Sequence, residues 1–282
     1  MSDKINLIVI GAGPGGYAAA FLAADLGMNV TVVDMEENPG GVCLYRGCIP
    51  SKALLHVAKL IGEANESKNW GIEFPEPKIN LDKLREWKDS VVAKNTGGLG
   101  VLSKSRKINY IQGKATFVSS SNLSVEKSDG NKEELSFDKA IIATGSRIVT
   151  IPSLNIESNR LLNSKTALDL PAIPKSLLVI GGGYIGLEIG TVYQALGSKV
   201  SVVEMMEGIL PGADRDLVSH LSKKLKSKFD EIILNSKVVE MNEEKNGIKV
   251  KIEDKDGKTD DKTYDYVLMS VGRKPDTSGL GL

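Results

Sequence analysis

The sequence predicts an α/β fold made of two similar units, each built on a parallel β-sheet. The first observation is an internal repeat, because residues 5–36 and 175–206 match without a gap at an offset of 170 residues. The second is that each copy opens with an apolar run, passes through a Gly-x-Gly-x-x-Gly motif and ends at an acidic residue. This order indicates a strand, a helix and a second strand in each copy, as in a Rossmann-like dinucleotide-binding domain.

We expect these elements at matching positions in the two copies. The opening apolar runs do not alternate with polar residues, which is typical of strands covered on both faces. Gly27 and Gly197 follow the helices, where a glycine commonly ends a helix. The expected strand, helix and second strand are residues 7–10, 15–26 and 30–33 in the first copy and 177–180, 184–196 and 199–203 in the second.

The glycines and acids of each copy have defined tasks. The first glycine permits a tight turn, the second lets a pyrophosphate approach the backbone, and the third packs the helix against the strand. These glycines are Gly11, Gly13 and Gly16 in the first copy and Gly181, Gly183 and Gly186 in the second. Asp34 and Glu204 end the second strands, where a carboxylate would bind the adenosine ribose. A unit of this fold without a dinucleotide is the alternative, and two occupied sites would suggest electron transfer between two cofactors.

Helices are expected in two further parts of the chain. Residues 53–102 predict two helical stretches separated by the polar, proline-containing segment 67–80. Residues 214–228 predict an amphipathic helix with aspartates early and lysines late. That order suits the helix dipole, so the lysines indicate a solvated face rather than a binding patch.

Strands around turns are expected after the first helical region and near the end of the chain. They fall within residues 110–147 and 247–272 and predict β-meander insertions. The turn at Thr144 and Gly145 would return the chain to the first nucleotide site. Residues 148–174 contain three prolines and are the best linker candidate.

Composition excludes several classes of function. Lysine plus arginine and aspartate plus glutamate both number 36, which gives no electrostatic case for binding nucleic acid or a membrane surface. No stretch approaches the roughly 18 apolar residues of a membrane span. The first residues lack a basic region followed by a long apolar run, so we expect a cytosolic protein.

The two cysteines, Cys43 and Cys48, lie in "GGVCLYRGCIPSK" shortly after the first ribose acid. The apolar run that follows suggests a helix beginning near Cys48, whose positive end would favour the thiolate, as would Lys52 if it lay close. A zinc site would need His56 and His220 as further ligands, and two inert core cysteines are the other alternative. We expect a redox-active disulfide beside a redox cofactor, and no metal site.

These motifs together resemble the flavin-dependent disulfide oxidoreductases, and within them the branch that oxidises dihydrolipoamide with NAD⁺. The resemblance covers the whole chain and is carried by "GAGPGG", "GGVCLYRGCIPSK", "ATGSR", "GGGYIGLEIG", "VVEMM" and "VGRKPDT". It implies that the first motif binds FAD and the second binds NAD. The cofactor-binding residues it implies are Gly11, Gly13, Gly16, Asp34, Gly41, Lys52, Thr144, Gly145, Gly181, Gly183, Tyr184, Gly186, Glu204, Gly272 and Arg273.

The resemblance also implies catalytic roles. Cys43 would be the interchange thiol that reacts with the substrate, and Cys48 would form a charge-transfer complex with the flavin. Lys52 and Glu188 match an ion pair near the flavin N5, although both could instead be surface charges on separate helices. Tyr184 falls where some members place a ring over the flavin.

The cysteine segment departs from the commoner form of this family at three positions. Threonine is usual at Val42, asparagine at Tyr45 and valine at Arg46. Both cysteines and Lys52 are kept, so the redox chemistry is not put in doubt, while substrate-side contacts could differ.

The resemblance implies a domain order and partners. Residues 1–147 would be the FAD-binding domain with the redox disulfide, 148–270 the NAD-binding domain, and 271–282 the start of a return to the first domain. Family members continue with a dimerisation domain that supplies a His-Glu base, so this chain would be the nucleotide-binding portion of a homodimeric enzyme and a poor catalyst alone. Expected partners are a lipoyl domain and 2-oxo acid dehydrogenase complexes. An NADPH-dependent disulfide or mercuric reductase, or a nucleotide-binding module without catalysis, are the alternatives.

Overall fold

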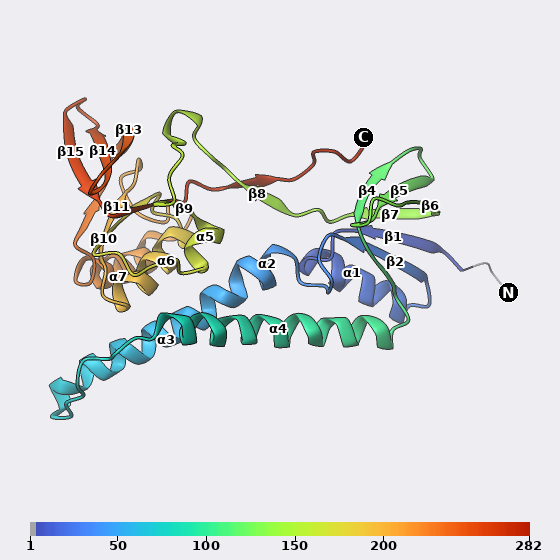
Figure 1. Ribbon diagram of the computed structural model, residues 1–282, viewed down its shortest axis with the longest axis horizontal. Helices are drawn as coiled ribbons and strands as arrows, with labels where there is room; N and C mark the ends of the chain where they lie inside the picture. The colour runs from blue at the N-terminus through green and yellow to red at the C-terminus, as the bar shows by residue number, and fades with distance from the viewer. Residues whose placement is uncertain (1–3) are drawn as a thin grey trace. The chain divides into compact units, whose positions relative to one another are not determined.

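The computed structural model describes residues 4–282 of the chain, which divide into two compact units. Within the described residues, unit 1 consists of residues 4–50, Asp89–Arg147 and Lys274–Leu282. Unit 2 consists of Ser51–Lys88 and Ile148–Arg273. Figure 1 shows parallel strands, helices and antiparallel strands in both units, which confirms the predicted α/β class.

Unit 1 is built on a four-stranded parallel sheet in the order β3-β2-β1-β7. Its strands are β1 (Asn6–Ile10), β2 (Asn29–Asp34), β3 (Asn109–Gln112) and β7 (Lys139–Ile142). Helix α1 (Pro14–Asp25) connects β1 to β2, as the apolar and glycine pattern predicted. An antiparallel meander of β4 (Lys114–Phe117), β5 (Asn122–Glu126) and β6 (Lys132–Ser136) is inserted between β3 and β7.

The sheet of unit 1 is apolar on both faces. Alternate residues of β1 face opposite ways, so Leu7 and Val9 pack with α1 residues such as Ala20, while Ile8 packs with the meander residue Leu123. A sheet covered on both faces needs continuous apolar strands, which explains why the opening run of the sequence does not alternate.

Unit 2 repeats this plan with a five-stranded parallel sheet in the order β12-β11-β10-β16-β9. Its strands are β9 (Leu161–Asn163), β10 (Ser176–Ile180), β11 (Lys199–Val203), β12 (Glu231–Ile233) and β16 (Tyr266–Met269). Helix α6 (Tyr184–Ala195) connects β10 to β11, and a meander of β13 (Ser236–Glu244), β14 (Gly247–Asp254) and β15 (Thr259–Tyr264) precedes β16.

The two units share the register of their central strand pair. Leu7 pairs with Val30 in unit 1, and Leu177 pairs with Val200 in unit 2, so both partners are displaced by 170 residues. The repeat in the sequence therefore encodes the same strand pairing twice, and both glycine motifs lie at the carboxyl end of a central strand.

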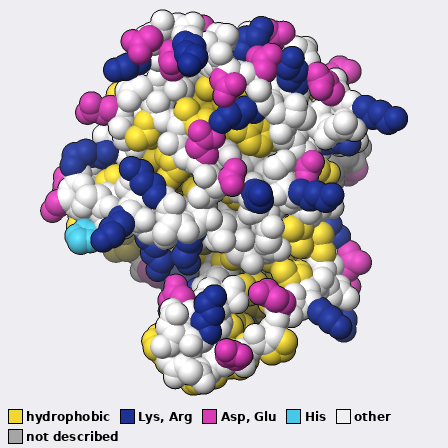
Figure 2. Space-filling view, turned by 90° about the vertical axis from the view of Figure 1, so that its left-hand side faces the viewer, with side chains coloured by type: hydrophobic (Ala, Val, Ile, Leu, Met, Phe, Trp, Pro, Cys, Tyr) yellow, Lys and Arg dark blue, Asp and Glu magenta, His cyan; other side chains and the backbone are white. Residues whose placement is uncertain are grey.

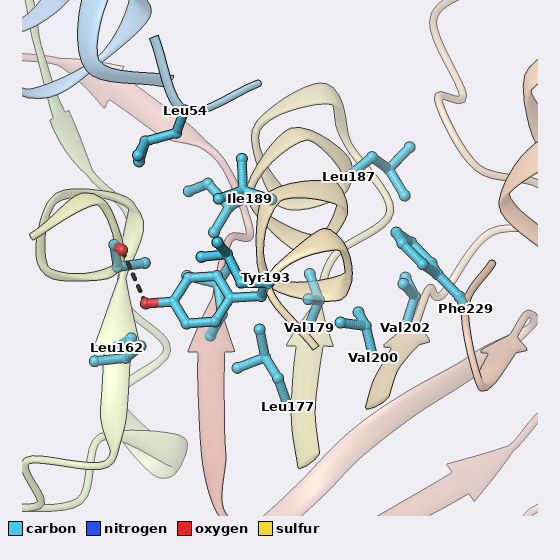
Figure 3. Close-up of a cluster of buried hydrophobic side chains, with 14 of the residues drawn as sticks. Leu54, Leu162, Leu177, Val179, Leu187, Ile189, Tyr193, Val200, Val202 and Phe229 are labelled. Carbon is cyan, nitrogen blue, oxygen red and sulfur yellow. Dashed lines mark hydrogen bonds between the residues drawn. The ribbon is translucent and has the colours of Figure 1, made fainter. Parts of the chain in front are cut away.

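The core of unit 2 includes residues from α3 (Cys48–Glu66) and α4 (Leu81–Ser105). Leu54 of α3 is 1% exposed and belongs to the cluster around Tyr193, whose hydroxyl donates a hydrogen bond of 2.9 Å to the Ala167 carbonyl (Figure 3). The buried ammonium of Lys88 likewise donates to the Leu168 carbonyl at 3.0 Å. Residues 51–88, which the sequence analysis grouped with the first nucleotide unit, thus pack into unit 2.

The remaining elements lie in segments that the sequence left partly irregular. The expected linker at 148–174 contains the 3₁₀ turn η2 (Pro152–Leu154), strand β9 and helix α5 (Ser164–Leu168), and η1 (Ser67–Trp70) follows α3. The predicted amphipathic helix is α7 (Arg215–Lys226), and β8 (Ser146–Ile148) pairs with β17 (Arg273–Pro275).

The surface shown in Figure 2 carries lysines and arginines interspersed with aspartates and glutamates, in keeping with the balanced composition. Among residues 4–282, every helix is too short or too polar to cross a bilayer.

The packing of α3 into unit 2 can be tested on two leucines of the same helix. Leu54→Ala should lower the free energy of unfolding by about 2–5 kcal/mol, because it leaves a cavity in a close-packed core. Leu60→Ala removes a side chain that is 62% exposed, and should change that energy by less than about 0.5 kcal/mol. Denaturant unfolding curves measure both values, and similar values for the two variants would contradict this packing.

Candidate functional site

The first glycine motif forms a tight turn between β1 and α1. Gly11 has φ +96°, and a Cβ there would collide with the Ala143 carbonyl oxygen. A Cβ at Gly16 would collide with the Gly11 carbonyl oxygen. Gly13 is the N-cap of α1, so the turn delivers the backbone to the start of that helix. The first and third positions of the motif therefore require glycine for steric reasons, as the motif implied.

The carboxylate of Asp34 holds this turn from the end of β2. Its Oδ2 accepts a hydrogen bond of 2.6 Å from the Ala12 amide, and its Oδ1 accepts one of 2.8 Å from the Glu36 amide. Burial raises the pKa of Asp34, while the Ala12 hydrogen bond and the positive charge of Arg46 oppose that rise. Each carboxylate oxygen has a second lone pair, so the group can still accept ribose hydroxyls.

A pocket of about 410 Å³ lies at this end of the unit 1 sheet. Three of the predicted residues, Gly11, Asp34 and Thr144, line it. The hydroxyl of Thr144 donates to the Asp276 carbonyl at 2.6 Å, and the Asp276 amide donates to the Gly145 carbonyl at 3.0 Å. Gly145 has φ +73°, a conformation that glycine adopts without strain.

The second glycine motif reproduces this arrangement in unit 2. Glu204 accepts 2.7 Å and 2.8 Å hydrogen bonds from the amides of Gly182 and Met206, which are the positions equivalent to Ala12 and Glu36. Gly181 has φ +104°, and a Cβ there would lie 2.5 Å from the Ser270 carbonyl oxygen. A Cβ at Gly186 would lie 2.5 Å from the Gly181 carbonyl oxygen.

A pocket of about 570 Å³ opens over this second motif. Its lining includes six of the predicted residues, namely Gly181, Gly183, Tyr184, Glu204, Gly272 and Arg273. The Tyr184 side chain is 65% exposed, and apolar side chains such as Leu154 and Val203 form much of the remaining wall. The pocket thus combines an apolar wall with a carboxylate, as a nucleoside site requires.

Both glycine motifs have backbone donors suited to a phosphate. In the described chain no side chain caps α1 or α6, and the first turn of each helix contains no acidic residue. By contrast, α5 has a capping box between Asn163 and Thr166, and α7 has Asp216 in its first turn. Uncapped amides at the positive end of a helix bind phosphates well, so the residues present fit a dinucleotide at each motif.

The cysteine segment contacts the first glycine turn. It forms a short helix, α2 (Gly41–Arg46), which contains Cys43, and Cys48 opens α3. Gly41 has φ +56°, and a Cβ there would lie 2.5 Å from the Cα of Gly13. Cys43 is half-buried, Cys48 is exposed, and the two come close to contact. This proximity is compatible with a disulfide between them.

Other predicted or considered residues have clear positions. The Lys52 ammonium lies 2.8 Å and 2.9 Å from the two carboxylate oxygens of Glu188, so the expected ion pair forms within unit 2. His56 and His220 are both exposed on helices α3 and α7. Within residues 4–282, no group of three or more His, Cys, Asp or Glu side chains is arranged to hold a metal ion.

The sequence did not predict helix α2, nor the contact that Asp276 makes at the first pocket. Helix α2 has only six residues and begins after two glycines, which leaves little periodic signal. Asp276 bonds through its backbone, which any residue could supply; the sequence carried no signal for that contact.

Comparisons with known proteins match the chain, over residues 5–282, to the family described as pyridine nucleotide-disulphide oxidoreductase. The dihydrolipoyl dehydrogenase of Haemophilus influenzae is 49% identical over 272 residues, covering 96% of this chain and 56% of that protein. The one from Geobacillus stearothermophilus is 44% identical, covering 99% of this chain and 58% of that protein. The chain therefore spans a little over half the length of these curated relatives.

Solved structures share the fold. LpdA from Mycobacterium tuberculosis superposes with a TM-score of 0.88 at 27% identity, covering 98% of this chain and 60% of that one. The Cu(II) complex of RclA, an HOCl-induced flavoprotein disulfide reductase from Escherichia coli, gives a TM-score of 0.82 at 26% identity, covering 99% of this chain and 59% of that one.

The environment of Asp34 predicts a pH dependence of stability. Burial raises the pKa of Asp34 in the folded state above its unfolded value, so the folded state binds this proton more tightly. The stability contribution is therefore present at low pH and lost as pH rises through the raised pKa. Relative to Asp34→Asn, the unmodified protein should gain stability as pH falls from neutral to about pH 4.

Asp129 provides a comparison of opposite sign. Hydrogen bonds from Asn131 lower the pKa of Asp129, so the unmodified protein should lose stability relative to Asp129→Asn as pH falls below about 4, through that lowered pKa. Urea unfolding at several pH values measures both differences. Equal slopes for the two variants would contradict the assigned environments.

Proposed function

The chain belongs to the pyridine nucleotide-disulphide oxidoreductase family, whose members use FAD and NAD, and on that premise we propose that it carries the nucleotide-binding and disulfide centre of an enzyme that oxidises dihydrolipoamide with NAD⁺. The observation that carries the proposal is the paired arrangement of Asp34 and Glu204. Each carboxylate holds its own glycine turn beside its own pocket.

We assign FAD to unit 1 because the cysteine segment belongs to that unit. The backbone of Gly41 packs on Gly13, so Cys43 is carried by a helix that begins against the glycine turn. Asp34 would accept hydrogen bonds from the adenosine ribose of FAD, and the uncapped amides of α1 would donate to its pyrophosphate. Gly16, Thr144 and Gly145 would complete the turn around the nucleotide.

We assign NAD to unit 2 because of the carboxylate of Glu204. Glu204 can accept a hydrogen bond from a ribose 2′-hydroxyl, and its charge would repel the 2′-phosphate of NADP. The first arginine after Glu204 is Arg215, whose guanidinium donates to the backbone carbonyls of Ile209, Leu210 and Ala213. The guanidinium of Arg215 is therefore occupied by hydrogen bonds to its own loop and is not placed to bind a 2′-phosphate.

The cysteines would perform the exchange with substrate. A thiolate of the dithiol substrate attacks the sulfur of Cys43, which releases the Cys48 thiolate and forms a mixed disulfide. The second substrate thiolate then closes the substrate disulfide and releases Cys43, so two electrons pass from substrate to the cysteine pair. Their onward transfer from Cys48 is chemistry that bound FAD and NAD supply.

The proposed substrate rests on the relatives. Proteins named dihydrolipoyl dehydrogenase are 41–49% identical to this chain over 96–100% of its length. We therefore propose dihydrolipoamide, carried on a lipoyl domain of a 2-oxo acid dehydrogenase complex, as the dithiol, and a homodimer as the whole enzyme. We also propose the cytosol as its location, because disulfides in that compartment are usually transient and catalytic. Lys52 and Glu188 remain proposed parts of the active site.

An NADPH-dependent disulfide reductase is the second candidate. The likeness to RclA supports the disulfide-reductase part of this candidate, because that protein is described as a flavoprotein disulfide reductase. The two candidates differ in nucleotide preference and therefore in the role of Glu204.

Glu204→Gln should weaken NAD(H) binding by about 10- to 100-fold, because it removes a charged acceptor from a ribose hydroxyl. Isothermal titration calorimetry on the unmodified chain and the variant measures both affinities. Lys237→Gln provides a control, because Lys237 lines the same pocket and pairs with Glu253 at 2.9 Å, away from the glycine turn. Tighter binding of NADP(H) than NAD(H) by the unmodified chain would favour the second candidate.

The separate roles of the two cysteines can be tested by absorbance spectroscopy. With FAD bound, two-electron reduction should produce a long-wavelength absorbance band that Cys48→Ser removes, whereas Cys43→Ser should show the band without added reductant. The physical reason is that only a thiolate at Cys48 would lie against the flavin. A band that survives in Cys48→Ser would show that the two roles are reversed.

A further inference from the structure

Tyr45 and Arg46 are two of the three positions at which the cysteine segment departs from the commoner form of its family, and both contact one loop. That loop is Met35–Gly40, which follows Asp34 and is named here the ribose loop. Its last residue donates a backbone hydrogen bond of 2.8 Å to the Ala12 carbonyl in the glycine turn. The ribose loop therefore connects the carboxylate of Asp34 to the start of the cysteine helix α2.

Tyr45 binds the middle of the ribose loop through its hydroxyl. The hydroxyl oxygen accepts a hydrogen bond of 3.3 Å from the Asn38 amide and donates one of 3.0 Å to the Asn38 carbonyl. A phenol can make both contacts because its oxygen is donor and acceptor together. The asparagine usual at this position is shorter, so it could not place a single atom between the same two groups.

Arg46 binds the first part of the ribose loop through an ion pair with the Glu36 side chain. The two side chains are 34% and 28% exposed, so the pair is partly shielded from solvent. Arg46 also lies near enough to Asp34 for its charge to act on that carboxylate. A valine at this position could supply neither interaction.

Glu36 is held at three separate groups. Its amide donates to Asp34 at 2.8 Å, its carbonyl accepts from the Tyr110 hydroxyl at 2.9 Å, and its carboxylate pairs with Arg46. A continuous set of bonds therefore runs from the ribose acid through Glu36 and Arg46 to the helix that contains Cys43. No part of this set crosses between the two units.

We propose that Tyr45 and Arg46 are positioning residues that couple FAD binding at Asp34 to the redox equilibrium of the Cys43–Cys48 pair. The inference rests on the proposed function, because it needs FAD in unit 1 and a disulfide between the cysteines. Ordering of the ribose loop around the adenosine ribose fixes α2 in one position, and release of the loop lets α2 move. By linkage, FAD then changes the reduction equilibrium of the pair, and reduction changes FAD affinity by the same factor.

The test measures FAD affinity and thiol equilibrium separately. FAD affinity comes from the quenching of flavin fluorescence on titration of the flavin-free chain. The equilibrium comes from glutathione buffers, in which two glutathione thiols become one glutathione disulfide as the pair takes up two electrons and two protons. Alkylation and intact mass give the buffer ratio that half-reduces the pair, with and without FAD.

In the unmodified chain, FAD should change that half-reduction ratio by about fivefold or more. Tyr45→Phe and Arg46→Gln should each weaken FAD binding by about 3- to 10-fold and, at saturating FAD, reduce the FAD-dependent change by about twofold or more, the remainder coming from contact of Cys48 with the flavin. The exchanged pair Glu36→Arg with Arg46→Glu should recover part of both effects, whereas Arg46→Glu alone should not. Arg106→Gln is the matched control, because Arg106 forms a unit 1 ion pair with Asp25 at 3.1 Å and lies outside the ribose loop.

The outcomes separate the two proposals. Failure of the unmodified chain to bind FAD, or to form the disulfide, would overturn the proposed function. If it does both, but FAD leaves the half-reduction ratio unchanged, the coupling is overturned. Unchanged behaviour of Tyr45→Phe and Arg46→Gln, or an exchanged pair no better than Arg46→Glu, would overturn the assignment to these residues. Circular dichroism at matched temperature confirms that each variant is folded.

Discussion

In each unit, one carboxylate accepts hydrogen bonds from two backbone amides, and the geometry of the nucleotide site depends on this contact. Asp34 and Glu204 each bind an amide inside the glycine turn and another just beyond their own strand. The contact fixes the end of the second strand relative to the turn after the first strand. It also leaves lone pairs on the same oxygens for a ribose, so the group that orders the site can also select its ligand.

The glycine conformations follow from this geometry. The turn must pass close to the backbone just after the neighbouring strand, β7 or β16, where a Cβ at Gly11 or Gly181 would meet a carbonyl oxygen. The helix must then start against the turn, where a Cβ at Gly16 or Gly186 would meet the first glycine. Helices that begin in this way present uncapped amides, and phosphate binding is the chemistry that uses them.

The sequence predicted these parts because their signals are local. The apolar strands, the three glycines of each motif and the terminal acid all lie within one continuous stretch, and their order is the same in both copies. The ion pair of Lys52 with Glu188, however, was known only from a family resemblance, since 136 residues separate its partners. The structure shows it at hydrogen-bonding distance.

Other features depend on packing that no local pattern records. Residues 51–88 belong to unit 2 because Leu54 packs in the cluster around Tyr193. The order of segments along the chain does not indicate this packing. The role of Tyr45 and Arg46 depends on where the ribose loop folds, so in sequence they were only departures from a common motif. Strand β9 was hidden in a proline-containing segment, since three residues are too few to show a period.

Native mass spectrometry of this chain with both nucleotides tests the central claim most directly. Two independent sites predict one species that contains one chain, one FAD and one NAD, with neither nucleotide displacing the other. Asp34→Ala should remove mainly FAD from that species, and Glu204→Ala mainly NAD. Mutual displacement of FAD and NAD, or loss of the same nucleotide from both variants, would contradict the assignment of one nucleotide to each carboxylate.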